Sequence, residues 1–242
     1  MRILITNDDG FDKEGIRLLA EWAKTIGEVT VIAPKVEQSA KSHAIEIRNP
    51  IEVKKVHITD GVTAYSMSST PADCIRFGLT TLKDKFDLVL SGINSGVNVG
   101  VDIVYSGTIG AIFEAARLGV PAIGFSSFPD TLAAAATQLD KVYDYIVKNK
   151  LFTKNPIYNV NIPEKAKGIR MTYQGSPYFS DEFKLIDGQE NMYMPAGVPI
   201  EDVCPDDLDR DTVAIHKGYI SITPLISTRT NMEVVEEFRT KG

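Results

Sequence analysis

The first third of the chain alternates short apolar segments with an amphipathic one, and this alternation restricts the fold more than any other feature. Residues 3–6 and 29–33 are short apolar runs that predict buried strands. Between them, residues 15–26 repeat apolar side chains at helical spacing, with charged side chains on the opposite face. A strand, a helix and a second strand with such short connections predict a βαβ unit, which has parallel strands and a right-handed crossover.

The alternation of strands and helices continues to residue 162. A sequence with this pattern predicts an α/β fold in which a mostly parallel sheet is flanked by helices. An Asp-Gly pair at residues 60–61, between two short apolar segments, also indicates a hairpin. The further expected strands cover 45–56, 87–91, 121–125 and 157–162, and the expected helices begin at Thr70 and cover 108–118 and 131–147.

The pattern changes after residue 162. Residues 183–194 predict a projecting hairpin, residues 213–215 and 219–222 a pair of strands, and residues 231–239 a short terminal helix. No linker or repeat separates this region from the preceding one. We therefore expect a single α/β domain over 1–242, with a core at 1–162 and a β-rich extension at 163–242.

Charge and cysteine content limit the function classes. The 242 residues include 26 Lys and Arg against 32 Asp and Glu, a net charge of −6, which favours neither nucleic-acid coating nor an anionic membrane surface. Cys74 and Cys204 are too few for a disulfide framework and indicate free thiols. Because no signal peptide or membrane-spanning run is present, the sequence predicts a cytoplasmic protein that does not enter membranes.

Three polar clusters follow predicted parallel strands. They cover residues 7–10, 38–43 and 91–98, and a helix start at residues 105–108 comes soon after the third. Open α/β sheets bind ligands at the carboxyl ends of their strands, where neighbouring loops diverge. We therefore expect these clusters to share one site.

Adjacent carboxylates are the strongest chemical signal. Asp8 and Asp9 repel each other unless a cation lies between them, and a divalent ion such as Mg²⁺ or Mn²⁺ prefers carboxylates and neutral oxygens. Ser39 and Asn94 supply neutral oxygens at two neighbouring strand ends. The alternative is that Asp-Asp-Gly is an ordinary exposed turn. The placement favours a metal site held by all four residues.

The helix start at Ser106, Gly107 and Thr108 is a candidate phosphate site. Free backbone N–H groups at a helix N-terminus bind phosphate, and two hydroxyls lie beside them. A plain helix cap is the alternative. We include Asn98 among the expected phosphate ligands. His43 is a candidate acid, base or phosphate contact, with a packed or solvated loop histidine as the alternative.

These motifs, taken in order, resemble the survival-protein SurE family of metal-dependent nucleotidases. The resemblance covers nearly the whole chain and rests on five segments that are moderately specific singly and specific together. The segments are Ile5-Thr6-Asn7-Asp8-Asp9-Gly10, Ala33-Pro34 followed by Gln38-Ser39 and Ser42-His43, Thr70-Pro71-Ala72-Asp73-Cys74, residues 91–108, and Gly218-Tyr219-Ile220-Ser221-Ile222-Thr223-Pro224-Leu225.

The resemblance implies a Rossmann-like core and one divalent ion per subunit, Mg²⁺ or Mn²⁺, on Asp8, Asp9, Ser39 and Asn94. It implies hydrolysis of nucleoside 5′- and 3′-monophosphates, with polyphosphate as a further substrate. It also implies a cytoplasmic homodimer or homotetramer with exchanged C-terminal segments. Asp8 and Asp9 would be the catalytic carboxylates, and the sequence does not choose between water and a carboxylate as the nucleophile.

Two other classes share part of this pattern. An aspartyl-phosphate phosphatase of the haloacid-dehalogenase type needs Asp-x-Asp after the first strand, whereas Asp8 and Asp9 are adjacent here. A non-enzymatic metal- and nucleotide-binding regulator fits the acidic pair, but it leaves the helix start at residues 106–108 unexplained.

Overall fold

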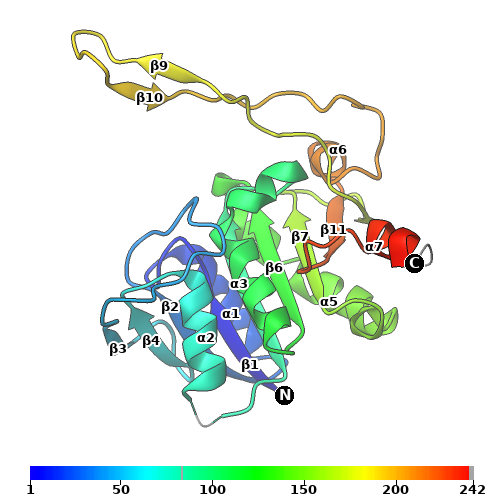
Figure 1. Ribbon diagram of the computed structural model, residues 1–242. Helices are drawn as coiled ribbons and strands as arrows, with labels where there is room; N and C mark the ends of the chain where they lie inside the picture. The colour runs from blue at the N-terminus through cyan, green and yellow to red at the C-terminus, as the bar shows by residue number, and fades with distance from the viewer. Residues whose placement is uncertain (83, 240–242) are drawn as a thin grey trace.

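The computed structural model describes residues 1–82 and 84–239, and a nine-stranded sheet forms its centre (Figure 1). Strand order across this sheet is β3-β4-β2-β1-β5-β6-β7-β11-β8. A separate two-stranded ribbon is formed by β9 and β10. The strands are β1 Arg2–Thr6, β2 Glu28–Pro34, β3 Val53–Val56, β4 Thr63–Met67, β5 Leu88–Ser95, β6 Ala122–Ser127, β7 Ile157–Ile162, β8 Ile169–Met171, β9 Phe183–Leu185, β10 Tyr193–Pro195 and β11 Ile220–Leu225.

Six consecutive strands, from β4 to β7, are parallel to their neighbours, as expected from the βαβ pattern. The edge strand β3 and the inserted strand β11 are antiparallel to β4 and β7. From β1 the chain moves outward to β2 and β4 and then returns to β5 on the other side of β1. The loops after β1 and β5 therefore diverge at a topological switch point, where α/β sheets bind ligands.

Helices cover both faces of the sheet. One core cluster packs α1 and α5 against one face, and α2 and α3 form a second core on the other. No helix in the described ranges is long and apolar enough to cross a membrane. The α-helices are α1 Glu14–Ala23, α2 Pro71–Thr80, α3 Gly107–Arg117, α4 Leu132–Ala136, α5 Leu139–Lys148, α6 Asp211–His216 and α7 Met232–Arg239, and the 3-10 helices are η1 Gly100–Tyr105, η2 Pro129–Thr131 and η3 Leu151–Thr153.

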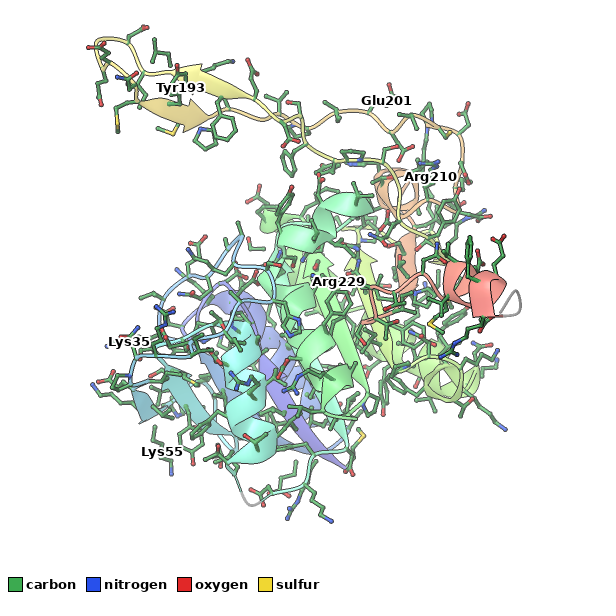
Figure 2. All side chains as sticks on the ribbon, in the orientation of Figure 1. Lys35, Lys55, Tyr193, Glu201, Arg210 and Arg229 are labelled. Atoms are coloured by element: carbon green, nitrogen blue, oxygen red, sulfur yellow. The ribbon has the colours of Figure 1, made fainter. Side chains whose placement is uncertain are left out.

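The region after β7 combines sheet strands with a projection. β8 and β11 join the large sheet, whereas the β9–β10 hairpin extends away from it (Figure 1). Figure 2 shows Tyr193 on this hairpin, well away from the side chains that cover the sheet. The expected β-rich extension, projecting hairpin and terminal helix are thus confirmed.

Several local expectations were wrong. Residues 213–215 lie in α6 and not in a strand, and the expected helix over 131–147 is divided into η2, α4 and α5. The hairpin near Asp60 pairs β3 with β4, so its turn is longer than the Asp-Gly pair alone, and residues 45–52 form no strand.

Candidate functional site

The loop after β1 lies at the switch point, and the side chain of its first residue, Asn7, bonds back to Gly10. The Asn7 side chain donates to the Gly10 carbonyl at 2.9 Å and accepts from the Gly10 N–H at 3.3 Å. These two bonds satisfy a buried amide and fix the two intervening residues, Asp8 and Asp9, in a tight turn. The second predicted cluster is attached to the same loop, since the Gln38 N–H donates to the Asp8 carbonyl at 2.7 Å.

Asp8 is buried against the start of α3. Its side chain is only 4% exposed, and its Oδ1 accepts a hydrogen bond of 2.6 Å from the Thr108 hydroxyl. A Cβ atom at Gly107 would lie 2.9 Å from the Asp8 Cβ, so glycine permits this close approach. Burial raises the pKa of Asp8 to about 6, the bond from Thr108 opposes the rise, and the charge of Asp9 adds to it.

Asp9 faces the loop after β5. Its Oδ2 accepts from the Ser95 N–H at 3.1 Å. Burial raises the pKa of Asp9 above its ordinary value, the bond from Ser95 lowers it, and the charge of Glu37 raises it further. Both carboxylates are thus partly removed from water and lie beside other negative charge, which makes the pair a favourable place for a cation.

The other two expected metal ligands lie beside this pair. Asp8, Ser39, Asn94, Asn98 and Ser106 line one cavity of about 560 Å³. Ser39 also lines a neighbouring cavity together with Asp9. The Asn94 amide nitrogen donates to the Gly96 carbonyl at 2.7 Å, which leaves its oxygen as the group available for a cation.

Asp8 and Asp9 are the adjacent carboxylates of this arrangement; Glu37 borders the cavity that Asp9 lines, and Asp102, Asp181 and Glu182 border the larger one. No group of three or more His, Cys, Asp or Glu side chains suited to a metal occurs in the part of the chain that the structure describes. A metal at this site would therefore rely on neutral oxygens for its remaining ligands. Hydroxyl and amide oxygens are the neutral ligands that hard divalent ions accept.

At the start of α3, the hydroxyls of Ser106 and Thr108, both expected to bind phosphate, already take part in hydrogen bonds within the protein. The Ser106 hydroxyl accepts from the Ile109 N–H at 3.2 Å and so caps the helix, while it also borders the main cavity. Thr108 is fully buried, and its hydroxyl is directed to Asp8. The first turn of α3 lies next to the Asp8 side chain at Gly107, and a bond from the main chain of Thr108 also lowers the pKa of Asp8.

His43 does not line the main cavity. Its Nε2 lies 2.8 Å from Oε2 of the buried Glu114, whose other oxygen is bound by Arg117. His43 instead borders a second cavity of about 230 Å³, which shares Ser106 with the main one. In this geometry His43 attaches the loop after β2 to α3.

Sequence reasoning missed two groups around the cavity. Tyr105, Tyr178, Phe179 and Phe183 contribute aromatic surface from η1 and from the base of the hairpin. Asn159 and Asn161 of β7 both donate to the Asn98 carbonyl in the loop after β5. An available signal for the second group was the pair of amide side chains, two residues apart, in an otherwise apolar strand.

The chain is similar to known proteins over most of its length. The family model for survival protein SurE matches residues 3–181. A 5′-nucleotidase SurE from Thermoanaerobacter sp. (strain X514) is 40% identical over 93% of this chain and 92% of its own length. One from Thermosipho africanus (strain TCF52B) is 39% identical over 98% of this chain and 95% of its own.

A solved structure of the Sure protein from Aquifex aeolicus has a TM-score of 0.80 and 33% identity, with 99% of both chains covered. Both the sequence relatives and the solved structure thus extend over nearly the full chain. The fold, the loops after β1 and β5 and these matches lead to one conclusion: the chain belongs to the survival-protein SurE family.

Proposed function

We propose that the chain is a divalent-metal-dependent phosphomonoesterase that hydrolyses nucleoside 5′-monophosphates to nucleoside and phosphate. The relatives named 5′-nucleotidase SurE support the nucleotidase activity. The observation that carries the metal dependence is the adjacent carboxylate pair, the buried Asp8 and the half-buried Asp9, each beside a cavity at the switch point. A phosphomonoester is a dianion, so a site that contains two carboxylates can accept it only with added positive charge.

The donor set suits one Mg²⁺ or Mn²⁺ ion per subunit. Asp8 and Asp9 would supply the charged ligands, and Ser39 and Asn94 the neutral oxygens. The raised pKa of Asp8 supports this assignment, because burial disfavours its charge when no cation compensates it. The bound ion would neutralise phosphoryl charge and acidify a nearby water.

The protein groups position the phosphate against the carboxylates. Asn98, Ser106 and the N–H groups that begin at Gly107 would hold phosphoryl oxygens, since a helix N-terminus attracts anions. Thr108 would act through Asp8, because its hydroxyl is bonded to that carboxylate. One of the two carboxylates would orient the attacking water.

The nucleoside would occupy the outer part of the cavity. Aromatic side chains there offer flat surfaces on which any base can stack, so the cavity is compatible with several bases. We extend the proposal to nucleoside 3′-monophosphates and polyphosphate, whose phosphoryl groups could reach the same carboxylate pair through this open cavity.

A turnover assay tests the function. Phosphate release is measured from a panel of 5′- and 3′-monophosphates and from polyphosphate, with Mg²⁺ or Mn²⁺ and with excess chelator. We expect hydrolysis of 5′-monophosphates that chelation abolishes. Full activity of the metal-stripped protein would contradict the metal site. Binding without turnover would favour a regulator, and a trapped phospho-aspartate would favour a haloacid-dehalogenase-type mechanism.

We also propose a cytoplasmic homodimer or homotetramer that exchanges its C-terminal segment. The terminal helix α7 has 8 residues, fewer than an isolated helix needs for stability. Met232 and Val234 on it are about half exposed in the single chain. In this proposal residues 1–162 form the catalytic core, and residues 163–242 form the extension that joins subunits within one domain.

A further inference from the structure

The main chain of Asn98 is held by two amide side chains of β7. The Asn98 N–H donates to Oδ1 of Asn161 at 2.8 Å. The Asn98 carbonyl accepts from Nδ2 of Asn161 at 2.7 Å and from Nδ2 of Asn159 at 2.8 Å. Asn161 thus contacts both peptide groups of a single residue, as a neighbouring strand would. We call this set of three bonds the asparagine clamp.

The clamp follows from the strand pattern. Asn159 and Asn161 are two residues apart, so they project from the same face of β7. Both are fully buried. Burying an amide is unfavourable unless it is hydrogen-bonded, and every hydrogen bond donated by these two side chains ends on Asn98. The clamp therefore satisfies the amide N–H donors of both side chains and the Oδ1 of Asn161, whereas the buried Oδ1 of Asn159 has no hydrogen-bond partner among the described residues.

The side chain of Asn98 is fixed from the adjacent strand. Its Nδ2 donates to the Ser126 hydroxyl of β6 at 2.8 Å. In the sheet, Ser126 is the register partner both of Asn94 on β5 and of Asn161 on β7. The expected metal ligand Asn94, the Ser126 hydroxyl and the clamp residue Asn161 thus form one row across the carboxyl ends of three strands.

We propose that Asn159 and Asn161 are positioning residues that hold Asn98, and with it the segment between β5 and η1, against the main cavity. Their catalytic consequence rests on the proposed phosphatase function. Displacing a positioned group by about 1 Å can reduce turnover by about 100-fold. Asp8, Asp9 and Ser39 come from other loops, and the fourth expected metal ligand, Asn94, is held within β5 itself. The clamp therefore acts mainly on phosphate positioning and only weakly on metal binding.

The test compares alanine variants of two asparagines, one near the carboxyl end of β7 and one just before the strand begins. Asn161→Ala removes two of the clamp bonds. Asn155→Ala is the matched control, because Asn155 also donates to two main-chain carbonyls, those of Ile157 and Leu225, but lies far from the cavity. The measurements are kcat and KM with a nucleoside 5′-monophosphate, the Kd for Mn²⁺ alone, and amide hydrogen exchange of peptides that cover residues 96–100.

We expect kcat of Asn161→Ala to fall at least about tenfold. The Kd for Mn²⁺ should change less than about threefold, and exchange at 96–100 should rise. Asn155→Ala should lose stability without these changes. If Asn161→Ala does not fold, Asn159→Ala, which removes a single clamp bond, should show the same changes with smaller amplitude.

Other results would overturn the inference. Unchanged exchange at 96–100 in both clamp variants would show that no clamp operates, whatever the activity. Raised exchange with wild-type kcat would show a structural bond with no role in positioning. If the wild type hydrolyses no phosphomonoester, the proposed function fails, and that failure is distinct because exchange reports the clamp without substrate.

Discussion

At the scale of single residues, the site is organised by two adjacent carboxylates that have lost part of their hydration. The backbone turn that Asn7 closes holds Asp8 and Asp9 together, and burial raises the pKa of both. Such an arrangement costs free energy in the absence of a cation. Binding of a divalent ion would remove this repulsion. The free energy that the two carboxylates cost in the metal-free protein therefore contributes to its affinity for metal.

Replacing Asp9 by Asn separates chemistry from folding. The amide preserves shape and an oxygen that can accept the Ser95 N–H, but the charge is lost. We expect metal affinity and turnover to fall at least about 100-fold, because a charged ligand becomes neutral. The melting temperature of the metal-free protein should stay level or rise, because like-charge repulsion is relieved.

Asp12→Asn is the control for Asp9→Asn, since it makes the same charge change at an exposed position of the same loop. This variant should keep the metal affinity and the turnover of the wild type. Wild-type turnover in Asp9→Asn, or inactivity caused only by misfolding, would count against the assignment of this residue to the metal.

Replacing Thr108 by Ala tests the bond to Asp8. The Thr108 hydroxyl lowers the pKa of Asp8, so its removal should raise that pKa above about 6. A metal binds the deprotonated carboxylate, and protons therefore compete below the pKa. Mn²⁺ affinity should begin to fall at higher pH in Thr108→Ala than in wild type, whereas Thr108→Ser, which keeps the hydroxyl, should follow the wild type.

Mn²⁺ titrations between about pH 5.5 and about pH 8 provide the measurement. Superimposable affinity profiles for Thr108→Ala and Thr108→Ser would mean that the hydroxyl does not influence Asp8. A loss of turnover with unchanged Mn²⁺ affinity would instead place the hydroxyl on the substrate.

At the scale of elements, the site depends on loops that are attached to helices. Glu114 of α3 is buried and bonded to His43 from the loop after β2 and to Arg117 on its own helix. Arg76 of α2 lies 3.7 Å from it. This network ties the loop that carries Ser39 to the helix whose first turn faces Asp8.

The network makes stability depend on pH. Burial alone would raise the pKa of Glu114, but the bonds from His43 and Arg117 outweigh it and hold that pKa at about 2, below its ordinary 4.5. The stabilisation by Glu114 is therefore complete above the ordinary value and is lost as pH falls toward about 2. Glu114→Gln should cost about 1.5 kcal/mol at neutral pH, because bonds to charged groups are lost but the partners His43, Arg76 and Arg117 are partly exposed to water.

Denaturant unfolding of wild type and Glu114→Gln over this pH range provides the measurement. The difference in unfolding free energy should shrink as the solution is acidified below the ordinary pKa. Glu21→Gln, which removes an exposed ion pair with Arg17, is the control and should cost at most about 0.5 kcal/mol. A difference for Glu114→Gln that is independent of pH would contradict the proposed charge pairing.

Strong local signals allowed the elements to be predicted. Thr70 caps α2 through a bond from the Asp73 N–H, as its position before Pro71 indicates. Residues 213–215 were placed in a strand because a short apolar run fits a buried strand or a buried helix equally well, and tertiary packing selects α6.

Parallel strands bring the polar clusters together, so their convergence was predictable as well. The bond from Thr108 to Asp8 joins residues 100 positions apart, and the asparagine clamp joins β7 to a loop more than 60 positions earlier. Contacts of this range are set by packing. The sequence shows that two amides interrupt an apolar strand, but it does not show which distant groups they bond.

At the scale of the whole molecule, the extension presents apolar surface that the core does not cover. Phe183 is 69% exposed and Tyr193 is 59% exposed on the projecting hairpin (Figures 1 and 2). A two-stranded ribbon is marginally stable by itself, and clustered exposed apolar side chains are typical of interaction surfaces. The base of the same hairpin borders the main cavity through Phe179 and Phe183, so the element that carries this exposed apolar surface also lines the candidate site.

Replacing the cross-strand pair Leu185 and Tyr193 with serine tests whether the hairpin joins subunits. These residues are register partners, and both side chains are more than half exposed. If a second subunit covers them, the double variant should sediment as a smaller species than wild type at micromolar concentration, because the buried apolar area is lost.

Lys184→Ser, on the same strand, is the control and should assemble normally. The core at residues 1–162 should keep its metal affinity in both variants, since the hairpin contributes none of the expected ligands. A wild type that sediments only as a monomer, or a double variant that assembles like wild type, would show that the hairpin is not a subunit interface.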